Sequence, residues 1–353
     1  MSGSRWFDNS LVLRDGVRLI SRIWLPNNND GPWPALLMRQ PYGREIASTI
    51  TYSHPEWWAS KGYMVIIQDV RGMGSSEGVF NGFYQEASDT SETHEWIRSL
   101  KECNGKLGLY GFSYQGFTQL TGELNSKPPD CLSPAMTGMN IKEHWCSDGG
   151  AYWWHNNIAW GLQIAALKMK RENNLFEWGK IRLALENKSY LREGIDILKK
   201  YDPNSFVLEW LKNLNNACPF EEFKPISTWI KQPMLIIGGL WDPHLKGAFD
   251  LYKKSKEAGG SPEMIIGNAT HLNWWEGSQE SLLKFFDKHL KSDEKCDSKK
   301  LKGEKKIWNI SLNKWEELDN KFHPEFIFGL KSDGTANVAV EDGSLSINSK
   351  GSG

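Results

Sequence analysis

The sequence predicts an α/β fold in which a mostly parallel sheet carries helices on both faces. Over the first two-thirds of the chain, short apolar or β-branched runs alternate with longer segments of helical period, which is typical of strands joined by crossover helices. The turn-rich stretch PNNNDGPWP (26–34) connects the opening strands, so we expect an antiparallel flank there. A chain of 353 residues is long enough to bury a full core.

Within this alternating part, each predicted strand is a short apolar run, whereas the predicted helices repeat their apolar residues at the spacing of one helix face. Strands are expected at 17–24, 35–39, 64–69, 107–111, 132–136, 234–238 and 264–267. Helices are expected at 55–61, 87–100, 114–124, 245–257 and 278–290.

The alternation stops between 141 and 225, where helical spacing continues without any strand. A helical segment between two strands of a sheet is typical of a cap. We therefore expect residues 1–140 and 226–291 to form the core and 141–225 to form a helical cap inserted in it. From 292 to 353, a solvated connector rich in Lys, Asp, Glu and Ser leads to strands that are too few to close a core of their own.

The composition excludes several classes of partner. Lys and Arg number 42 against 43 Asp and Glu, and the net charge of -1 provides no field that would attract nucleic acid or an anionic membrane, which favours a small-molecule partner. The apolar runs are too short to span a bilayer and the start lacks the pattern of a signal peptide, so we expect a soluble, cytoplasmic protein. Five scattered cysteines without a C-x-x-C pair predict neither a disulfide framework nor a zinc site.

The stretch LGLYGFSYQG (107–116) predicts a nucleophilic serine. A strand followed by Gly111, Ser113 and a helix is the nucleophile-elbow arrangement, which exposes a serine oxygen at the carboxyl edge of a parallel sheet. The general pattern has glycine two residues after the serine, whereas this chain has Gln115 there and Gly116 next. Since Gly and Ser also occur at ordinary strand-to-helix turns, the assignment depends on partners elsewhere in the chain.

An acid and a base follow two later strands. A nucleophilic serine needs a base to take its proton and an acid to orient that base, and in this class of sheet they come in the order Ser, Asp, His. Asp242 lies just after the run PMLIIGG, and His271 lies just after PEMIIG. Because both the order and the places at strand ends match, we expect a triad of Ser113, His271 and Asp242 that needs no cofactor.

Other interpretations of these residues stay open at this point. Asp242 precedes Pro243, as many turn or helix-cap aspartates do. His244 competes with His271 as the base, but it is expected to begin a helix, which would leave the last strand end without a role. A metal site built from Asp242, His244 and His271 lacks a further ligand at recognisable spacing, so we expect no metal.

Two loops follow strands that precede the predicted serine in the sequence. The stretch QDVRGMGSSEGVF (68–80) is glycine-rich but matches neither a P-loop nor a dinucleotide pattern, so we interpret it as a structural loop in which Asp69 and Arg71 tie the strand end to its neighbours. The strand ending in RQPYGR leads to Tyr42, whose phenol is a candidate oxyanion donor together with the backbone amide of Tyr114. A packed loop tyrosine is the alternative.

Six stretches of the chain resemble the CocE/NonD-type serine hydrolases, namely RDGVRL, RQPYGR, VIIQDVRGMGSSEG, GKLGLYGFSYQG, GGLWDPH and IIGNATHLNWW. This branch of the α/β-hydrolases contains cocaine-esterase-like and X-prolyl dipeptidyl-peptidase-like enzymes and α-amino-acid ester hydrolases. The resemblance implies an α/β-hydrolase fold and acyl transfer to water. It places the family's residues on this chain as follows: the elbow at Gly111, Ser113, Tyr114 and Gly116, the acid at Asp242, the base at His271 and the oxyanion tyrosine at Tyr42.

The resemblance also implies a further domain. Members of this family usually continue into a jelly-roll domain that packs over the hydrolase domain, so we expect 292–353 to hold the connector and the start of a truncated jelly-roll-like domain. The chain would then be a fragment of a longer protein or a hydrolase core with a vestigial β tail. Apolar surface left uncovered would favour association, which makes a homo-oligomer an option.

The implied substrate is a small ester, an amide or a short peptide. The cap residues Trp153, Trp154 and Trp160 are candidate walls of the substrate pocket, with packed cap core as the alternative, and Trp241 beside the acid is a further candidate. An ester is favoured because amide cleavage also needs well-placed protonation of the leaving nitrogen. X-prolyl dipeptidyl-peptidase activity, acyl transfer with the same triad, and an inactive fragment or binding module are the alternatives.

Overall fold

The computed structural model describes residues 5–28, 30–46, 51–215, 225–291 and 304–318, and the backbone of 329–331 and 346–348. Its strands are β1 (Arg5–Val12), β2 (Arg18–Leu25), β3 (Trp33–Gln40), β4 (Met64–Asp69), β5 (Cys103–Phe112), β6 (Cys131–Ala135), β7 (Ser147–Asp148), β8 (Ala151–Tyr152), β9 (Leu235–Gly239), β10 (Glu263–Gly267), β11 (Lys305–Asn309), β12 (Lys314–Glu317), β13 (Gly329–Lys331) and β14 (Ser346–Asn348).

The α-helices are α1 (Pro55–Ser60), α2 (Glu86–Ser99), α3 (Tyr114–Phe117), α4 (Trp154–Arg171), α5 (Leu175–Glu186), α6 (Tyr190–Tyr201), α7 (Phe206–Asn215), α8 (Ser227–Ile230), α9 (Leu245–Glu257) and α10 (Ser278–Phe286). Short 3-10 or π turns are η1 (Arg44–Ile46), η2 (Gly82–Gln85), η3 (Lys142–Cys146) and η4 (Asp287–Lys291).

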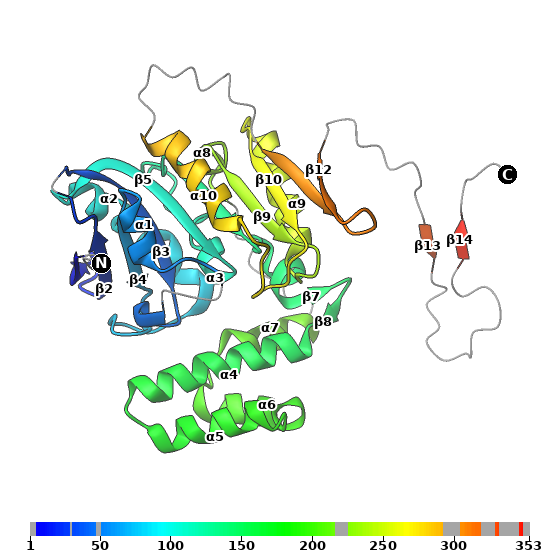
Figure 1. The fold of residues 1–353 in the computed structure, drawn as a ribbon. Coiled ribbons are helices and arrows are strands. Elements are labelled where there is room, and N and C mark those ends of the chain that lie inside the picture. The colour runs from blue at the N-terminus through cyan, green and yellow to red at the C-terminus, as the bar shows by residue number, and fades with distance from the viewer. Residues whose placement is uncertain are drawn as a thin grey trace.

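Most of the described strands form a single sheet, in the order β1-β2-β4-β3-β5-β6-β9-β10-β11-β12 (Figure 1). Neighbours from β4 to β11 pair in parallel, whereas β1, β2 and β12 pair antiparallel at the two flanks. The parallel centre and the antiparallel opening flank confirm the predicted fold class. Because β3, β5, β9 and β10 run in one direction, their carboxyl ends meet at the same edge of the sheet, which is where ligands bind in such folds.

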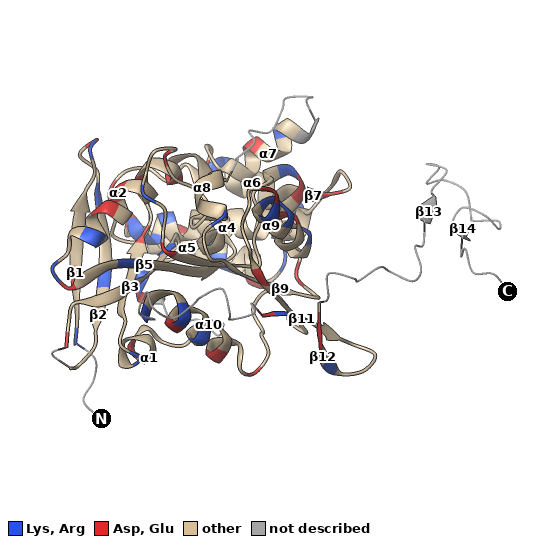
Figure 2. Cartoon of the chain, turned by 90° about the horizontal axis from the view of Figure 1, so that it is seen from above, with Lys and Arg blue, Asp and Glu red and all other residues tan. Residues whose placement is uncertain are grey.

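Helices cover both faces of this sheet. Trp58 of α1 and Leu282 of α10 belong to one buried apolar cluster, and Ile97 of α2 and Leu251 of α9 belong to another. Figure 2 shows α1 and α10 on one side of the sheet and α2, α8 and α9 on the other. The fully buried apolar strand segments lie between these layers, as expected for parallel strands that are covered on both faces.

Between β6 and β9 the chain forms η3, a hairpin of β7 and β8, and the helices α4 to α7, which lie together beyond the sheet in Figure 1. The predicted absence of strands from 141–225 is wrong at this hairpin, because Gly149 (φ 55°) and Gly150 (φ 86°) adopt the positive φ angles that a tight two-residue turn requires. The division into core and cap stays our interpretation. No helix in the described ranges is both long and apolar enough to cross a bilayer.

The helix predicted at 114–124 is much shorter, because α3 ends at Phe117. The side-chain amide of Gln119 donates to the carbonyl of Gly111 (3.1 Å), and its oxygen accepts from the amide of Ser133 (3.1 Å). These bonds hold Gln119 between β5 and β6. Further on, the indole of Trp229 lies where a side chain at Gly122 would stand.

The region beyond 292 also differs from the expectation. We expected a connector and the beginning of a separate β unit, but β11 pairs in parallel with β10 and so extends the main sheet. The edge is packed by aromatic rings, since Trp315 of β12 lies 5.3 Å from Trp275 and 5.3 Å from Trp308 between ring centroids. Most of the remaining residues of 292–353 lie outside the described residues.

The glycine-rich loop after β4 is held by ion pairs, as predicted. Asp69 accepts from the guanidinium of Arg44 (2.8 Å) and from the amide of Ser75 (2.9 Å). Arg71 donates to both carboxylate oxygens of Asp89 (3.0 and 2.7 Å). This loop therefore joins β4 to η1 and α2, which confirms its structural role.

Candidate active site

The turn between β5 and α3 has the backbone of a nucleophile elbow. Ser113 has φ 58° and ψ -127°, a conformation that costs a non-glycine residue energy and that clusters at functional sites. The amide of Ser113 donates to the carbonyls of Ala135 (3.0 Å) and Met136 (3.2 Å) at the end of β6, so the neighbouring strand holds the strained turn in place.

Two glycines make room for this turn. Gly111 has φ 141°, and a Cβ on it would lie 2.5 Å from Cβ of Gln115. A Cβ on Gly116 would lie 2.7 Å from Cγ2 of Thr137 and 3.0 Å from the carbonyl oxygen of Ala135. The close approach of α3 to β6 therefore requires glycine at 116, one residue later than in the general pattern.

Gln115 stands where the general pattern has glycine, and its side chain bridges to the next loop. Its oxygen accepts from the amide of Phe112 (3.3 Å), and its Nε2 donates to the side-chain oxygen of Gln40 (3.0 Å). Gln40 in turn donates to the carbonyl of Gly43 (2.9 Å). The elbow is thus linked to the loop that carries Tyr42.

The predicted acid and base form a hydrogen-bonded pair. Asp242 follows β9 and His271 follows β10, and Nδ1 of His271 lies 2.5 Å from Oδ2 of Asp242. The other carboxylate oxygen, Oδ1, accepts from the backbone amide of His244 (2.8 Å). The Asp242 side chain is fully buried, while 29% of the His271 side chain is exposed, so the pair presents its imidazole towards the surface.

The electrostatics of the pair favour an ionised acid. Burial raises the pKa of the Asp242 carboxyl, but the hydrogen bond and charge of His271 and the backbone amide of His244 outweigh it. The resulting pKa lies below the usual value for aspartate. An ionised Asp242 keeps the proton of His271 on Nδ1 and leaves Nε2 of the same ring free to act as a base.

The residue before Ser113 contacts this pair, although the Ser113 hydroxyl makes no hydrogen bond among the described residues. The ring of Phe112, the residue before it, is 5.2 Å from the His271 ring between centroids. Hydrogen bonds of catalytic groups are often long without substrate and tighten when it binds. The contact between Ser113 and His271 therefore stays a prediction.

Residues 15–273 match the family of X-Pro dipeptidyl-peptidases (S15 family). The chain belongs to this family. Cocaine esterase from Rhodococcus sp. (strain MB1 Bresler) is 32% identical to it over 156 residues, which cover 43% of this chain and 27% of that protein.

Two solved structures share the fold. A CocE/NonD family hydrolase from Staphylococcus aureus has a TM-score of 0.68 and 18% identity, covering 92% of this chain and 57% of that one. An α-amino acid ester hydrolase has a TM-score of 0.55 and 19% identity, covering 89% of this chain and 58% of that one. The chain spans less than two-thirds of each of these relatives. Their names confirm the predicted resemblance to CocE/NonD-type enzymes, a class of hydrolases.

The two predicted oxyanion tyrosines offer different hydrogen-bond donors: Tyr42 its phenol, and Tyr114 its backbone amide in the turn between β5 and α3. Burial raises the pKa of the half-buried Tyr42 phenol to about 12, so it stays protonated and can donate at neutral pH. Tyr114 is fully buried, and its hydroxyl bonds to Glu86 and to the carbonyl of Gly82, both at 2.7 Å. Its backbone amide, at the first position of α3, has no partner among the described residues.

The four predicted pocket tryptophans separate into two groups. Trp153 lies 5.9 Å from His244 between ring centroids, and 61% of Trp241 is exposed while its indole donates to Asn268 (2.7 Å). Trp154 instead donates to the carbonyl of Leu191 (3.1 Å), and Trp160 packs among aromatic rings that include Trp145 and Phe206. Trp153 therefore contacts the histidine next to the predicted base, and Trp241 precedes the predicted acid, whereas Trp154 bonds to α6 and Trp160 packs against η3 and α7.

Sequence reasoning missed a histidine pair beside the triad residues. The sequence suggested His244 only as a competing base or a metal ligand, yet its ring lies 5.3 Å from that of His271, and its Nδ1 lies 2.6 Å from the carbonyl oxygen of His144. His144 belongs to η3, a hundred residues earlier in the chain. No local pattern in the sequence predicts this contact.

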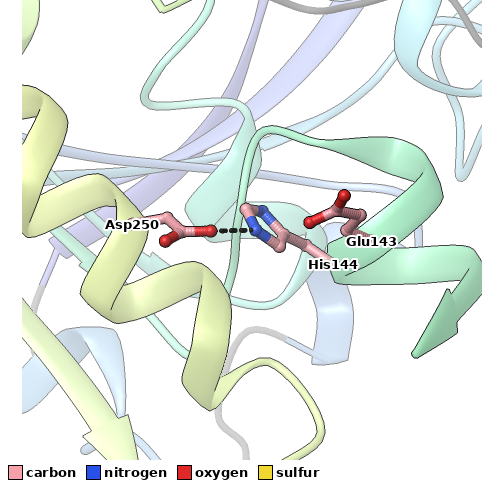
Figure 3. A group of neighbouring side chains, drawn as sticks. All are labelled: Glu143, His144 and Asp250. Carbon is pink, nitrogen blue, oxygen red and sulfur yellow. Dashed lines mark hydrogen bonds and ion pairs between the residues drawn. The ribbon is translucent and has the colours of Figure 1, made fainter. Parts of the chain in front are cut away.

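His144 also forms a group with Glu143 and Asp250 that has the side-chain types of a metal site (Figure 3). The ammonium group of Lys246 already lies 2.5 Å from the carboxylate of Glu143 and 3.1 Å from that of Asp250. One ammonium group therefore already bridges the two carboxylates, and Asp250 also bonds to His144, so we assign no metal to them.

Proposed function

We propose that this chain is a serine hydrolase that cleaves a small ester through Ser113, His271 and Asp242. The observation that carries the proposal is the 2.5 Å hydrogen bond between His271 and Asp242, which follow β10 and β9. The strained turn at Ser113, at the end of β5, supports it. Membership of the S15 family supports a hydrolase that acts on ester or peptide bonds.

The mechanism is acyl transfer to water. Nε2 of His271 takes the proton of the Ser113 hydroxyl as its oxygen attacks the substrate carbonyl, and Asp242 stabilises the imidazolium that forms. The imidazolium then protonates the leaving group, which gives an acyl-enzyme. Water attacks this intermediate with the same histidine as base, and the products are the free acid and the regenerated serine.

The oxyanion that develops on the carbonyl accepts hydrogen bonds from the Tyr42 phenol and the Tyr114 backbone amide. Donors that are already in place where charge develops cost little reorganisation, and removing one of them typically lowers the rate by about 10²–10³. The Gln115 and Gln40 bridge supports this arrangement, because it connects the turn that carries the amide to the loop that carries the phenol.

An X-prolyl dipeptidyl-peptidase is the second candidate, because the family match carries that name. An ester is favoured because amide cleavage needs a well-placed proton for the leaving nitrogen. The rates for p-nitrophenyl acetate and for a glycyl-prolyl p-nitroanilide decide between them. Product analysis with an added amine or alcohol separates hydrolysis from acyl transfer.

Labelling with a fluorophosphonate probe tests the assignment of the nucleophile. The probe should react with the unaltered chain, and mass spectrometry of the labelled peptide should place the adduct on Ser113. Ser113→Ala should abolish labelling and ester hydrolysis, whereas Ser99→Ala, at the exposed end of α2, should leave both unchanged. Undiminished turnover by Ser113→Ala would overturn the proposal.

A further inference from the structure

His244 is a buried histidine that the triad does not use. It precedes α9 and is 3% exposed, with its ring 5.3 Å from the ring of His271 and 4.5 Å from that of Trp145 between centroids. Its backbone amide holds Asp242, as described above, but that bond does not involve the imidazole. The side chain therefore has a separate role to be explained.

The contacts of His244 fix which ring nitrogen carries the proton. Nδ1 lies 2.6 Å from the carbonyl oxygen of His144. A carbonyl oxygen can only accept, so Nδ1 is the donor and Nε2 of the neutral ring holds a lone pair. Nε2 has no hydrogen-bond partner among the described residues, although nearly all of the side chain is buried.

The carbonyl that orients His244 is itself anchored. Nε2 of His144 bonds to Asp250 (2.8 Å), as Figure 3 shows, and Nδ1 of His144 accepts from the amide of Asn140 (3.2 Å). Lys246 of α9 also bonds to Asp250 of α9 and to Glu143 of η3. These bonds tie η3 to α9, so His144 can hold the ring of His244 in one orientation.

His271, the proposed base, also has one ring nitrogen in a hydrogen bond and one without a partner. Nδ1 of His271 is bound to Asp242, and Nε2 has no partner among the described residues. Two adjoining imidazoles with ring centroids 5.3 Å apart thus offer one open Nε2 each. A single water has two O–H groups, and bridging waters of this kind satisfy two acceptors at once.

We propose that His244 is the second hydrogen-bond acceptor for the water that hydrolyses the acyl-enzyme. The inference rests on the proposed function, and it adds a residue to the deacylation step. One proton of the water passes to Nε2 of His271 as its oxygen bonds to the acyl carbon, and this proton then passes to the oxygen of Ser113 as the ester bond breaks. The other O–H donates to Nε2 of His244, which gains no proton.

This arrangement distinguishes water from an alcohol. Methanol has one O–H, which it gives to His271, so its attack does not need a second acceptor. Water that attacks without His244 leaves one O–H directed at a buried side chain that offers no acceptor, which is unfavourable. Removing the acceptor should therefore slow hydrolysis and leave transfer to methanol largely unchanged.

The ratio of methyl acetate to acetate, formed from p-nitrophenyl acetate in buffer with methanol, measures this difference. His244→Phe keeps a flat ring but removes the acceptor, so the ratio should rise about tenfold, the effect of losing one hydrogen bond. His244→Gln keeps an acceptor oxygen and should retain most of the original ratio. His289→Phe, on η4, is the control and should leave the ratio of methyl acetate to acetate unchanged.

The unaltered chain provides a test that does not depend on how a variant folds. Burial and then the charge of His271 lower the pKa of His244 to about 4, although the charge of Asp242 and the hydrogen bond to the carbonyl of His144 oppose this shift. Protonated His244 cannot accept, so the ratio should rise as the pH falls towards this value. Any effect of pH that slows attack by water and by methanol equally cancels from the ratio.

The inference and the proposed function fail in different ways. If the unaltered chain neither reacts with a fluorophosphonate nor hydrolyses the ester, the proposed function is wrong. If it does both, but His244→Phe and low pH leave the product ratio unchanged, Ser113 is the nucleophile and His244 has no part in placing the water. If His244→Phe formed methyl acetate and acetate more slowly by the same factor, this would also contradict the inference, because it would indicate that the substitution distorts the active site as a whole.

Discussion

At the scale of single residues, Asp242 shows how one carboxylate serves two purposes. Its Oδ2 accepts from His271 and its Oδ1 accepts from the amide of His244, so neither oxygen is left unpaired in the interior. A buried carboxylate without such partners would be protonated, because burial disfavours the charged form. The partners instead keep the pKa of Asp242 below its usual value and fix the tautomer of His271.

Asp242→Asn tests this role with little change in shape. The amide can present an N–H to Nδ1 of His271, which favours the tautomer with the proton on Nε2 and removes the base. We expect kcat for p-nitrophenyl acetate to fall by about 10⁴, in line with the effect of this change in a serine protease. Asp196→Asn, on the exposed side of α6, is the matched control.

The thermal unfolding of both Asn variants shows whether the fold is kept. A folded Asp242→Asn variant with undiminished kcat would exclude Asp242 as the residue that orients the base.

At the scale of secondary-structure elements, the position of Ser113 depends on how closely α3 approaches β6. Helix α3 has only four residues and so gains little from its own hydrogen bonds, which leaves tertiary packing to hold it. The contacts at Gly116 and the polar side chains of Gln115 and Gln119 supply that packing. Small changes in this interface should therefore move Ser113, the proposed nucleophile.

Gly116→Ala tests the close approach. The new Cβ would lie 2.7 Å from Thr137 and 3.0 Å from the backbone of Ala135, and backbone cannot move aside as easily as a flexible side chain. We expect the free energy of unfolding to fall by about 1–3 kcal/mol, as for other overpacked sites, together with a fall in kcat. Urea unfolding and ester hydrolysis measure the two effects.

Gly179→Ala is the matched control, because no atom lies within 4 Å of a Cβ added at this position in α5. Alanine favours the helix over glycine by about 0.5–1 kcal/mol, so this variant should be more stable and equally active. Equal stability of the two variants would show that α3 can shift without cost.

The sequence predicted the elements of this site better than their contacts. Strand ends are marked by apolar runs, and the bond between His271 and Asp242 follows from two such ends meeting at one edge of the sheet. The length of α3 was not predictable, because Gln119 binds backbone of β5 and β6 rather than water. The bond from His244 to His144 joins residues a hundred positions apart and has no local pattern.

At the scale of the whole molecule, buried polar groups join the layers beneath the elbow. Arg39 of β3 forms a 2.7 Å ion pair with Glu86 of α2, and Glu86 also accepts from the hydroxyl of Tyr114 in α3. Burial raises the pKa of Glu86, and the charge of Arg39 opposes it. Sheet, helix and elbow therefore depend on one another, and we expect conditions that change these buried charges to destabilise the fold as a unit.

His94 of α2 is a buried histidine that should make the stability of the fold depend on pH. It is 1% exposed, stacks on Trp229 with ring centroids 5.1 Å apart, and neither ring nitrogen has a partner among the described residues. Burial, and then the charges of Arg98 and Arg39, hold the pKa of His94 well below its usual value. The unfolded chain therefore binds a proton below about pH 6.5 that the folded chain does not bind, and stability falls as the pH falls.

Between about pH 6.5 and pH 5, this single group should lower the free energy of unfolding by up to about 1.4 kcal/mol per pH unit. His94→Phe keeps a ring against Trp229 but removes the titrating group. The slope of the unfolding free energy against pH should therefore decrease by up to about 1.4 kcal/mol per pH unit, the contribution of one proton. Urea unfolding across this range measures the slope, with His54→Phe, at an exposed position, as the control. An unchanged slope in His94→Phe would mean that His94 takes up its proton in the folded chain as readily as in the unfolded one, which its sealed site between α2 and Trp229 should prevent.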